Sequence, residues 1–221
     1  MPKPRARLAV LASGSGSNLQ AIHDDLVARG ASAPAELVLV VSDREQAGAL
    51  ERANGWGVTA IWLPRSNANG LGALLAQHRI TLVALAGYLR LVPPDVVRAF
   101  RGRLLNIHPT LLPAFGGAGM YGQRVHDAVL RSGATVSGPT VHFVSEQYDE
   151  GAIIAQLPVP IRAGDTAATL AARVLAAEHR LYPACVAAVA AGQVSLGTDG
   201  RVHGASTLDI DRAAPRARNS H

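Results

Sequence analysis

The sequence predicts an α/β fold, with a doubly wound and mostly parallel sheet, an antiparallel C-terminal portion and a long C-terminal helix. Short, continuous apolar runs alternate with helical segments through the first half of the chain, which is typical of a parallel sheet covered on both faces. Beyond Pro113 the alternation stops, and two apolar runs separated by a short polar loop are followed by a long alanine-rich segment. These observations together favour a doubly wound sheet that ends in an antiparallel pair.

The first half contains five expected strands, each a short apolar run. They are Arg7–Ala12, Glu36–Ser42, Val58–Leu63, Leu82–Ala86 and Leu104–His108. Helices are expected between them, from apolar residues at helical spacing or from proline in a first turn. They cover Leu19–Val27, Gln46–Asn54, Leu71–His78 and Pro93–Phe100. Asn54-Gly55 is a helix-stop signal.

The second half begins with the glycine-rich stretch FGGAGMYG, which predicts a loop. Four elements are expected after it: a helix over Gln123–Arg131, strands over Ser137–Phe143 and Ile153–Ile161, and a helix over Thr166–Ala191. The two strands can pair across the loop Ser145–Gly151, and Val194–Leu196 can form a hairpin with Val202. We expect one domain over residues 1–206, with halves at about 7–100 and about 101–206, and a frayed tail over 207–221.

The composition is that of a globular protein, because 48% of the 221 residues are hydrophobic and 17% are charged. The lone cysteine, Cys185, excludes an intrachain disulfide and is expected to be a small buried residue rather than a nucleophile. No apolar run approaches the roughly 20 residues of a membrane span. The N-terminal MPKPRARLAV does not read as a signal peptide, so we expect a cytoplasmic protein.

The net charge of +5 suggests a protein that binds nucleic acid, but the positions of the charges argue against this hypothesis. Residues 1–7 carry +3 and residues 207–221 carry +1, which leaves +1 for everything between. A nucleic-acid binder needs a basic face on the folded body, or aromatic residues for stacking, and aromatics are only 4%. We expect the two basic ends of the chain to be solubilising tails. We expect neither a nucleic acid nor a membrane as partner.

A small-residue turn, SGSGSN over residues 13–18, follows the first expected strand directly. Glycine lets the backbone approach a ligand closely, and the N-terminus of the next helix attracts an anion. The third glycine of the dinucleotide fingerprint is replaced by Leu19, and the GK[ST] of the phosphate loop is absent. The turn therefore predicts a site for one phosphate group; the alternative is a tight turn capped by Ser17 or Asn18.

The strand expected over 104–108 carries Asn106 and His108 two residues apart, so that both side chains share one face. Asn can donate to a developing oxyanion, and His can transfer a proton near neutral pH. Without other context, a histidine simply packed at a strand end is equally compatible with the pattern.

The loop Ser145–Gly151 holds three acids, Glu146, Asp149 and Glu150. One of these carboxylates can reach a histidine across the sheet and raise its pKa, although a solvated loop is the alternative. His142 reads as a strand residue that lines or supports the site.

The segment LAGYLRL over residues 85–91 can hold a flat heteroaromatic ligand through its backbone, or it can be a plain strand-to-helix connection with Arg90 exposed. The histidines are scattered, and neither CxxC nor HExxH occurs, so no metal is expected.

Taken together, five segments resemble one family, in order and nearly collinear from about Leu8 to Val194. They are SGSGSNLQAI, LAGYLRLV, GRLLNIHPTLLP, GPTVHFV and YDEGAIIAQ. The chain resembles phosphoribosylglycinamide formyltransferase, a folate-dependent enzyme of purine biosynthesis with a Rossmann-like fold. The resemblance implies transfer of a formyl group from 10-formyltetrahydrofolate to the amine of 5-phosphoribosyl-glycinamide, by direct attack and a tetrahedral intermediate.

The same resemblance implies roles for individual residues. Asn106, His108 and Asp149 match the catalytic trio, with Asp149 keeping His108 protonated. The substrate side is implied to comprise Gly16, Ser17, Asn18, Leu175, Ala176, Ala177 and Glu178, where Glu178 meets the ribose hydroxyls. The folate side is implied to comprise Leu89, Arg90, Leu91, Val92, Asn106, Ser145, Glu146, Gln147, Tyr148 and Asp149.

Two stretches depart from the family pattern. Ala114–Gly122 lacks the basic residue found in relatives and is glycine-rich, which favours a mobile lid. Relatives often place a folate-contacting arginine in a longer loop after Leu63, where this chain has only Arg65, and that contact is left open.

Two other activities compete with formyl transfer. A formyltetrahydrofolate hydrolase shares the trio but usually carries an N-terminal regulatory domain, for which we expect no room before Arg7. A non-catalytic phosphate- or nucleotide-binding module would bind without turnover. Both a monomer and a homodimer are compatible with the sequence.

Overall fold

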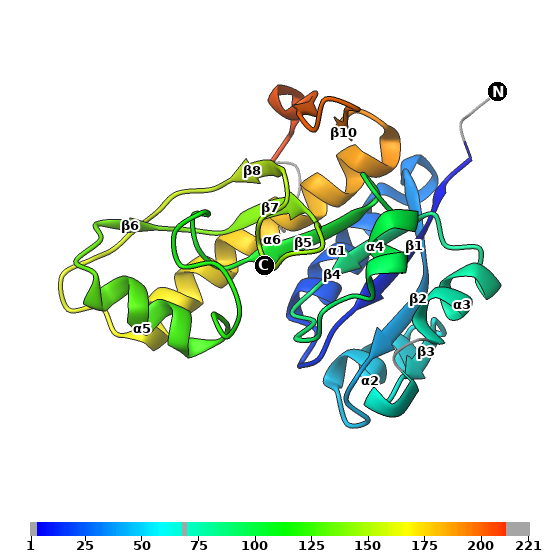
Figure 1. Ribbon diagram of the computed structural model, residues 1–221, viewed down its shortest axis with the longest axis horizontal. Helices are drawn as coiled ribbons and strands as arrows, with labels where there is room; N and C mark the ends of the chain where they lie inside the picture. The colour runs from blue at the N-terminus through cyan, green and yellow to red at the C-terminus, as the bar shows by residue number, and fades with distance from the viewer. Residues whose placement is uncertain (1–3, 68–69, 211–221) are drawn as a thin grey trace, which may run out of the picture.

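The computed structural model describes residues 4–67 and 70–210, and a seven-stranded sheet runs through the molecule in the order β3-β2-β1-β4-β5-β7-β8 (Figure 1). Its strands are β1 (Ala6–Leu11), β2 (Ala35–Ser42), β3 (Thr59–Trp62), β4 (Leu82–Leu85), β5 (Leu104–His108), β7 (Thr140–Phe143) and β8 (Ile153–Gln156). The first five pair in parallel, whereas β7 runs antiparallel to β5, and β8 antiparallel to β7. The predicted fold class is therefore confirmed.

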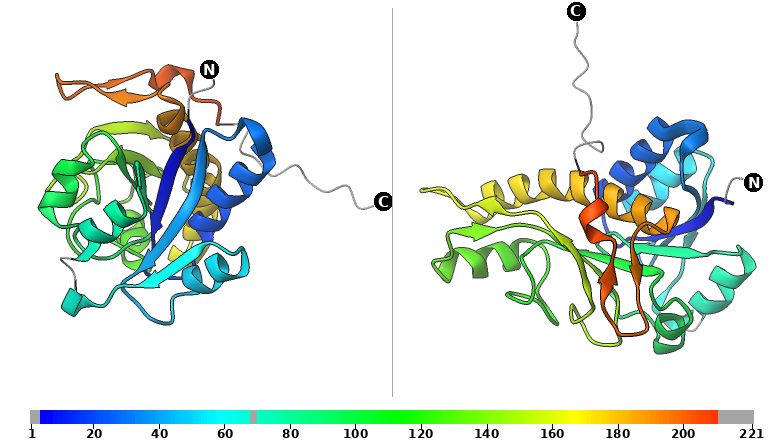
Figure 2. Two further views of the ribbon diagram at one scale, coloured as in Figure 1. Left: turned by 90° about the vertical axis from the view of Figure 1, so that its right-hand side faces the viewer. Right: turned by 90° about the horizontal axis from the view of Figure 1, so that it is seen from above.

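Helices cover both faces of this sheet (Figure 2). They are α1 (Ser17–Arg29), α2 (Gly48–Gly55), α3 (Gly70–Gln77), α4 (Pro94–Ala99), α5 (Gln123–Arg131) and α6 (Ala167–Ala191), with short 3-10 turns η1 (Gly30–Ser32), η2 (Arg65–Asn67) and η3 (Ala205–Thr207). Alternate residues of β1 enter opposite cores: Leu8 and Val10 pack with α1, α2 and α6, and Ala9 and Leu11 with α3 and α4. This alternation explains why each strand is apolar throughout.

The two strands expected after residue 136 are each broken by a proline. Pro139 separates β6 (Val136–Ser137) from β7, and Pro158 separates β8 from β9 (Val159–Pro160). Proline has no backbone N–H to donate to a neighbouring strand, so it interrupts the hydrogen bonding of a sheet. The prediction of two unbroken strands was therefore wrong. Their expected antiparallel pairing is confirmed, since β7 pairs with β8 and β6 with β9.

Helix α6 is the longest element and passes behind the sheet (Figure 1). Thr166 and Thr169 close its first turn with reciprocal hydrogen bonds. Further along, the fully buried Tyr182 donates its hydroxyl to the carbonyl oxygen of Leu85 at 2.8 Å, which ties α6 to the end of β4. Cys185 is also buried, and burial raises the pKa of its thiol, as expected of a packing residue.

The ends of the described chain are more ordered than the sequence suggested. Arg5 donates to the carbonyls of Gly30 and Ala31, and Arg7 to that of His78, so neither belongs to a free tail. After the hairpin of β10 (Ser195–Leu196) and β11 (Val202–His203), the partly buried Leu208 and Ile210, at the start of the expected tail, pack on the core. The rest of the expected tail, 211–221, lies outside the described residues.

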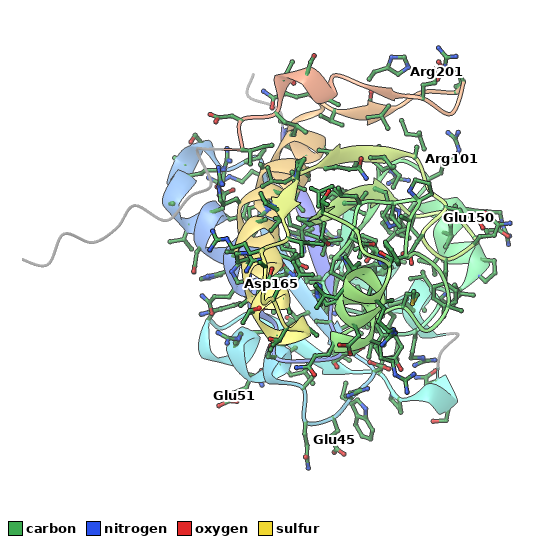
Figure 3. All side chains as sticks on the ribbon, turned by 90° about the vertical axis from the view of Figure 1, so that its left-hand side faces the viewer. Glu45, Glu51, Arg101, Glu150, Asp165 and Arg201 are labelled. Carbon is green, nitrogen blue, oxygen red and sulfur yellow. The ribbon has the colours of Figure 1, made fainter. Side chains whose placement is uncertain are left out.

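The surface charges are dispersed around the molecule, as Glu45, Glu51, Arg101, Glu150 and Arg201 illustrate (Figure 3). Among the described residues, no helix combines the length and the apolarity needed to cross a bilayer.

The helix-stop signal at Asn54-Gly55 is displaced by two residues. Helix α2 continues through Gly55, and the left-handed residue that ends the turn is Gly57, with φ of 71°. Glycine takes this conformation without steric cost, so the sequence alone does not distinguish Gly55 from Gly57 as the residue that ends the helix.

Candidate active site

The candidate site lies where the strand order reverses, between β1 and β4, at their carboxyl ends. Helices leave in opposite directions from two such strands and open a crevice between them. A cavity of about 480 Å³ occupies this crevice. It is lined by Asn18, Gly87, Tyr88, Leu89, Asn106, Ile107, His108, Pro109, Gly117, Ala118, Gly119, Met120, Tyr121, Gly122, Gln123, His126, Tyr148, Asp149, Ala171, Ala172, Leu175 and Glu178.

A narrow slot of about 50 Å³ adjoins the large cavity. It is lined by Leu85, Tyr88, Arg90, Leu91, Val92, Asn106, His142, Val144, Ser145, Gln147, Tyr148 and Asp149. Four residues line both spaces: Tyr88, Asn106, Tyr148 and Asp149. The two spaces therefore meet at an amide and a carboxylate.

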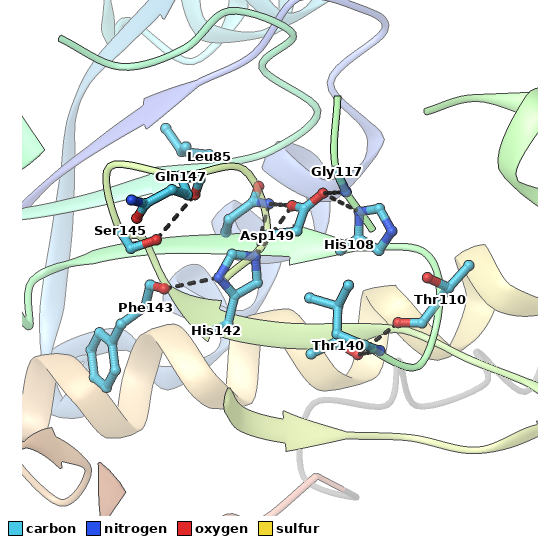
Figure 4. A network of polar contacts seen from close by, with 12 residues as sticks. Leu85, His108, Thr110, Gly117, Thr140, His142, Phe143, Ser145, Gln147 and Asp149 are labelled. Carbon is cyan, nitrogen blue, oxygen red and sulfur yellow. Dashed lines mark hydrogen bonds and ion pairs between the residues drawn. The ribbon is translucent and has the colours of Figure 1, made fainter. Parts of the chain in front are cut away.

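The three side chains expected to act together are brought together, and Figure 4 shows His108 beside Asp149. Asn106 Nδ2 lies 3.4 Å from Asp149 Oδ1, and His108 Nδ1 lies 3.4 Å from Asp149 Oδ2. Asn106 and His108 come from β5, whereas Asp149 comes from the loop between β7 and β8. Of the three loop acids left open by the sequence, Asp149 is the one that reaches the histidine.

His142 holds Asn106 in place from the neighbouring strand β7, and Figure 4 shows the His142 ring near Asp149. Its Nδ1–H donates to the carbonyl oxygen of Phe143 at 2.8 Å, which leaves Nε2 to accept from Asn106 Nδ2 at 3.1 Å. His142 also lines the narrow slot. The supporting and lining role expected for this strand residue matches its position.

The loop that carries Asp149 is shaped by tight backbone geometry. Asp149 adopts a left-handed conformation with φ of 57°, which is uncommon outside glycine. A Cβ on Gly151 would lie 1.6 Å from the carbonyl oxygen of Phe143, so only glycine fits there. Ser145 donates its hydroxyl to the carbonyl oxygen of Gln147 at 3.0 Å. The carboxylate is thereby turned toward β5.

The glycine-rich stretch 114–122, which we name the lid loop, contacts two of the three side chains directly. The carbonyl oxygen of Phe115 accepts a hydrogen bond from His108 Nε2 at 2.9 Å. The backbone N–H of Gly117 donates to Asp149 Oδ2 at 2.9 Å. The lid loop therefore occupies hydrogen-bonding positions that a ligand would otherwise use.

Burial sets the protonation of His108. It lowers the pKa of the imidazole below its ordinary value, and this effect exceeds the opposing influence of the Asp149 charge and the Phe115 carbonyl. The expected net rise in the pKa of His108 is therefore wrong for this arrangement, although Asp149 acts in the expected direction. Burial opposes ionisation of Asp149, yet His142, His108 and the Gly117 N–H hold its pKa below the ordinary value.

On the opposite wall of the large cavity, Asn18 of α1 donates its Nδ2–H to Glu178 Oε2 of α6 at 2.6 Å. Both side chains are buried. Burial raises the pKa of Glu178 to about 7, while the Asn18 contact lowers it by less. A carboxyl group of this kind changes its charge near neutral pH.

The turn before α1 has a different construction from the one expected. Gly16 is left-handed, with φ of 76°, and no side chain caps the helix, so capping by Ser17 or Asn18 was wrong. A Cβ on Gly16 would lie 2.9 Å from the Cα of Ala49. Glycine is thus needed at this position for close contact with α2. The uncapped N–H groups remain available to an anion.

Some of the other predicted residues line one of the two spaces, and some line neither. Leu89 and Leu175 line the large cavity, and the slot takes Arg90, Leu91, Val92, Ser145 and Gln147. Neither space is lined by Gly16, Ser17, Ala176, Ala177 or Glu146. Glu146 instead pairs with Arg98 at 3.0 Å on the surface. Nothing is described of the Arg65 side chain.

Tyr88 and His126 are among the lining residues that had no assigned role in the sequence analysis. Tyr88 lies inside the segment 85–91, so its place in that segment was a usable signal. His126 of α5 is buried and lines the large cavity, but a single histidine in an amphipathic helix gives no signal of its own. Within the described ranges, no group of three or more His, Cys, Asp or Glu side chains is arranged to hold a metal ion.

The fold and this crevice define an α/β enzyme of the formyl transferase class. The family model described as formyl transferase matches residues 6–186, which is most of the chain. The chain belongs to this family.

Its relatives narrow the class to the phosphoribosylglycinamide formyltransferases. The chloroplastic phosphoribosylglycinamide formyltransferase of Arabidopsis thaliana is 44% identical over 204 residues, covering 89% of this chain and 69% of the relative. The crystal structure of the phosphoribosylglycinamide formyltransferase from Anaplasma phagocytophilum superposes with a TM-score of 0.82 at 33% identity, covering 90% of this chain and 93% of that one. Glycinamide ribonucleotide transformylase 1 from Symbiobacterium toebii gives 0.81 at 42% identity, with coverage of 90% and 93%.

Proposed function

We propose that this chain transfers the formyl group of 10-formyltetrahydrofolate to the amine of 5-phosphoribosyl-glycinamide, in purine biosynthesis. The observation that carries the proposal is the meeting of two spaces of unequal size at Asn106 and Asp149. A reaction between two bound substrates needs such a junction, because orientation of the reacting atoms lowers the barrier. The named relatives support the choice of substrates.

The ribotide is assigned to the large cavity. Its phosphate group is placed at the uncapped turn of Gly16, Ser17 and Asn18, where free N–H groups and the helix dipole favour an anion. Glu178, on the far wall, is assigned to the ribose hydroxyls, which donate to its carboxylate. The amine then extends toward the trio of Asn106, His108 and Asp149.

The folate is assigned to the slot. The stretch from Arg90 to Val92 and the loop from Ser145 to Asp149 face each other across it and offer backbone groups to a flat ring system, while Leu89 lies in the adjoining large cavity. Of these residues, Glu146 is the weakest candidate because it pairs with Arg98 on the surface. This arrangement places the one-carbon unit of the folate beside Asn106.

The chemistry is a direct attack. The uncharged amine forms a bond to the formyl carbon, and the carbonyl electron pair moves to oxygen. Asn106 Nδ2 donates to His142 at 3.1 Å and lies farther from Asp149, at 3.4 Å. We assign the N–H that faces Asp149 to the oxyanion.

The proton released by the amine is assigned to the pair of His108 and Asp149. Because burial keeps the imidazole neutral near pH 7, His108 can accept a proton, and the ionised Asp149 stabilises the resulting imidazolium. When the intermediate collapses, the bond between the formyl carbon and the folate nitrogen breaks, and that nitrogen receives the proton. No side chain becomes formylated.

The proposal extends to the domain organisation, the co-substrate, the cellular location and the oligomeric state of the protein. Residues 1–206 act as one domain, because one sheet joins the phosphate turn to the trio. The co-substrate is the folate, without a metal. A cytoplasmic location and a monomer or homodimer stay predictions, and the relative from Arabidopsis thaliana carries the description chloroplastic.

An assay with single and paired substrates tests the proposal. We expect turnover only when glycinamide ribotide and 10-formyltetrahydrofolate are both present. Consumption of the folate without the ribotide would identify a hydrolase instead. Binding of either compound without turnover would identify a binding module.

A further inference from the structure

Six buried side-chain atoms among the described residues have no hydrogen-bond partner: Asn18 Oδ1, Arg90 Nη1, His126 Nδ1, Ser137 Oγ, Arg173 Nε and His179 Nε2. Three of them belong to residues that line the two spaces. Asn18 and His126 line the large cavity, and Arg90 lines the slot. Buried polar groups are normally paired, so an unpaired one in a residue that lines a cavity is a candidate for a contact made only when a ligand is bound.

His126 is the member of this set without an assigned role. It lies on α5, directly after the lid loop, and its side chain is only 5% exposed. Val125 and Val129 of the same helix are buried, which fixes α5 against the body of the protein. The imidazole of His126 is therefore held in the cavity wall by a packed helix rather than by the glycine-rich lid loop.

The position of His126 restricts what it can contact. It lines the large cavity and not the slot, so its partner is the ligand of the large cavity. His108 and His126 both line this cavity, together with Asn106 and Asp149. His126 therefore shares its space with the trio.

The charge state of His126 restricts its partner further. Burial is the main reason that its pKa lies below the ordinary value, and the nearby Asp127 opposes this effect only in part. A neutral imidazole offers one N–H donor and one lone pair. It therefore suits an amide or an amine, whereas a phosphate group is better served by a cation.

We propose that His126 is a substrate-binding residue whose imidazole hydrogen-bonds to the glycinamide portion of the ribotide, next to the trio. This inference rests on the proposed function, because it names the part of the ribotide that the large cavity holds there. It adds a contact from α5 to those assigned to α1, β5 and α6.

Calorimetric titration with the ribotide tests the assignment, using His126→Leu, which removes the polar atoms, and His126→Asn, which restores a hydrogen-bonding group. We expect His126→Leu to weaken ribotide binding about fivefold to tenfold, the equivalent of one hydrogen bond. We expect His126→Asn to recover most of that loss. The KM for 10-formyltetrahydrofolate should stay within about twofold of the wild type for both variants.

His179→Leu is the matched control, because His179 also carries an unpaired ring nitrogen but lines neither space. It should bind the ribotide like the wild type. Ribotide binding of wild-type strength in folded His126→Leu would overturn the inference. Equally weak binding by His126→Leu and His126→Asn would overturn it as well. Failure of the wild type itself to bind the ribotide would instead overturn the proposed function.

Discussion

The backbone N–H of Gly117 donates to Oδ2 of Asp149 at 2.9 Å, which joins the lid loop to the carboxylate at the junction of the two spaces. Two residues earlier, the carbonyl oxygen of Phe115 accepts from His108. The same loop therefore holds both members of the pair to which we assign the proton. Binding of substrates at the trio must compete with these contacts, so the lid loop and the chemistry are coupled.

Replacing His108 with alanine should lower turnover by about a hundredfold or more, because the pair loses its proton acceptor. The fold should persist, since His108 lies at the end of β5. Steady-state rates and circular dichroism measure the two effects. The exposed His203 provides the control variant, His203→Ala, with wild-type rates. Equal turnover in wild type and His108→Ala would remove His108 from the mechanism.

Asp149→Asn should move the acidic limb of the pH–rate profile to lower pH and reduce the maximal rate. The charge of Asp149 raises the pKa of His108, so its removal allows the imidazole to stay neutral in more acidic solution. The asparagine retains an oxygen for the Gly117 N–H. Profiles of kcat/KM against pH provide the measurement, with the exposed Glu150→Gln as control. An acidic limb that does not move would count against this coupling.

Gly16→Ala should destabilise the protein by about 2 kcal/mol or more, because the new Cβ meets α2 and the backbone is left-handed. Weaker ribotide binding should accompany the displaced turn. Gly14→Ala is the control, since a Cβ there has no neighbour within 4 Å. Urea unfolding compares the variants; equal stability of the two would show that the contact with Ala49 can relax.

Glu178 should make the stability of the unliganded protein fall as the pH rises toward and through 7. The pKa of Glu178 is about 7 in the folded protein, above the ordinary 4.5. The contribution of the protonated carboxyl group to the free energy of unfolding is therefore complete below pH 4.5, and it is lost as the pH rises through about 7. The full difference corresponds to about 3 kcal/mol. Unfolding of wild type and Glu178→Gln at about pH 5 and about pH 8 provides the test. A constant difference between the two proteins would contradict the assignment.

The arrangement of the elements was largely predictable because each carries a local signal. Continuous apolar strands alternate with helices as far as His108, and this alone predicts the parallel sheet. The boundaries were less certain where competing local signals occur. Pro139 and Pro158 interrupt apolar runs that otherwise look continuous, and Gly55 and Gly57 are equivalent stop signals in the sequence.

The site was predictable where short motifs carry it, and not where it depends on packing. Asn106 and His108 share a strand, and the choice of Asp149 followed from the resemblance. The pKa of His108 depends on how deeply the sheet and lid loop bury it, which spacing along the chain does not reveal. The same holds for His126, whose importance comes from a cavity assembled by six separate segments.

The burial of Cys185 in α6 makes the protein well suited to site-specific spectroscopy. Because the sequence has one cysteine and its thiol is sealed in the core, an introduced cysteine should react alone with a thiol-directed dye. Tyr121 in the lid loop is half exposed and gives a natural attachment point. A fluorophore at that position would report lid motion in solution without any need to remove a native thiol first.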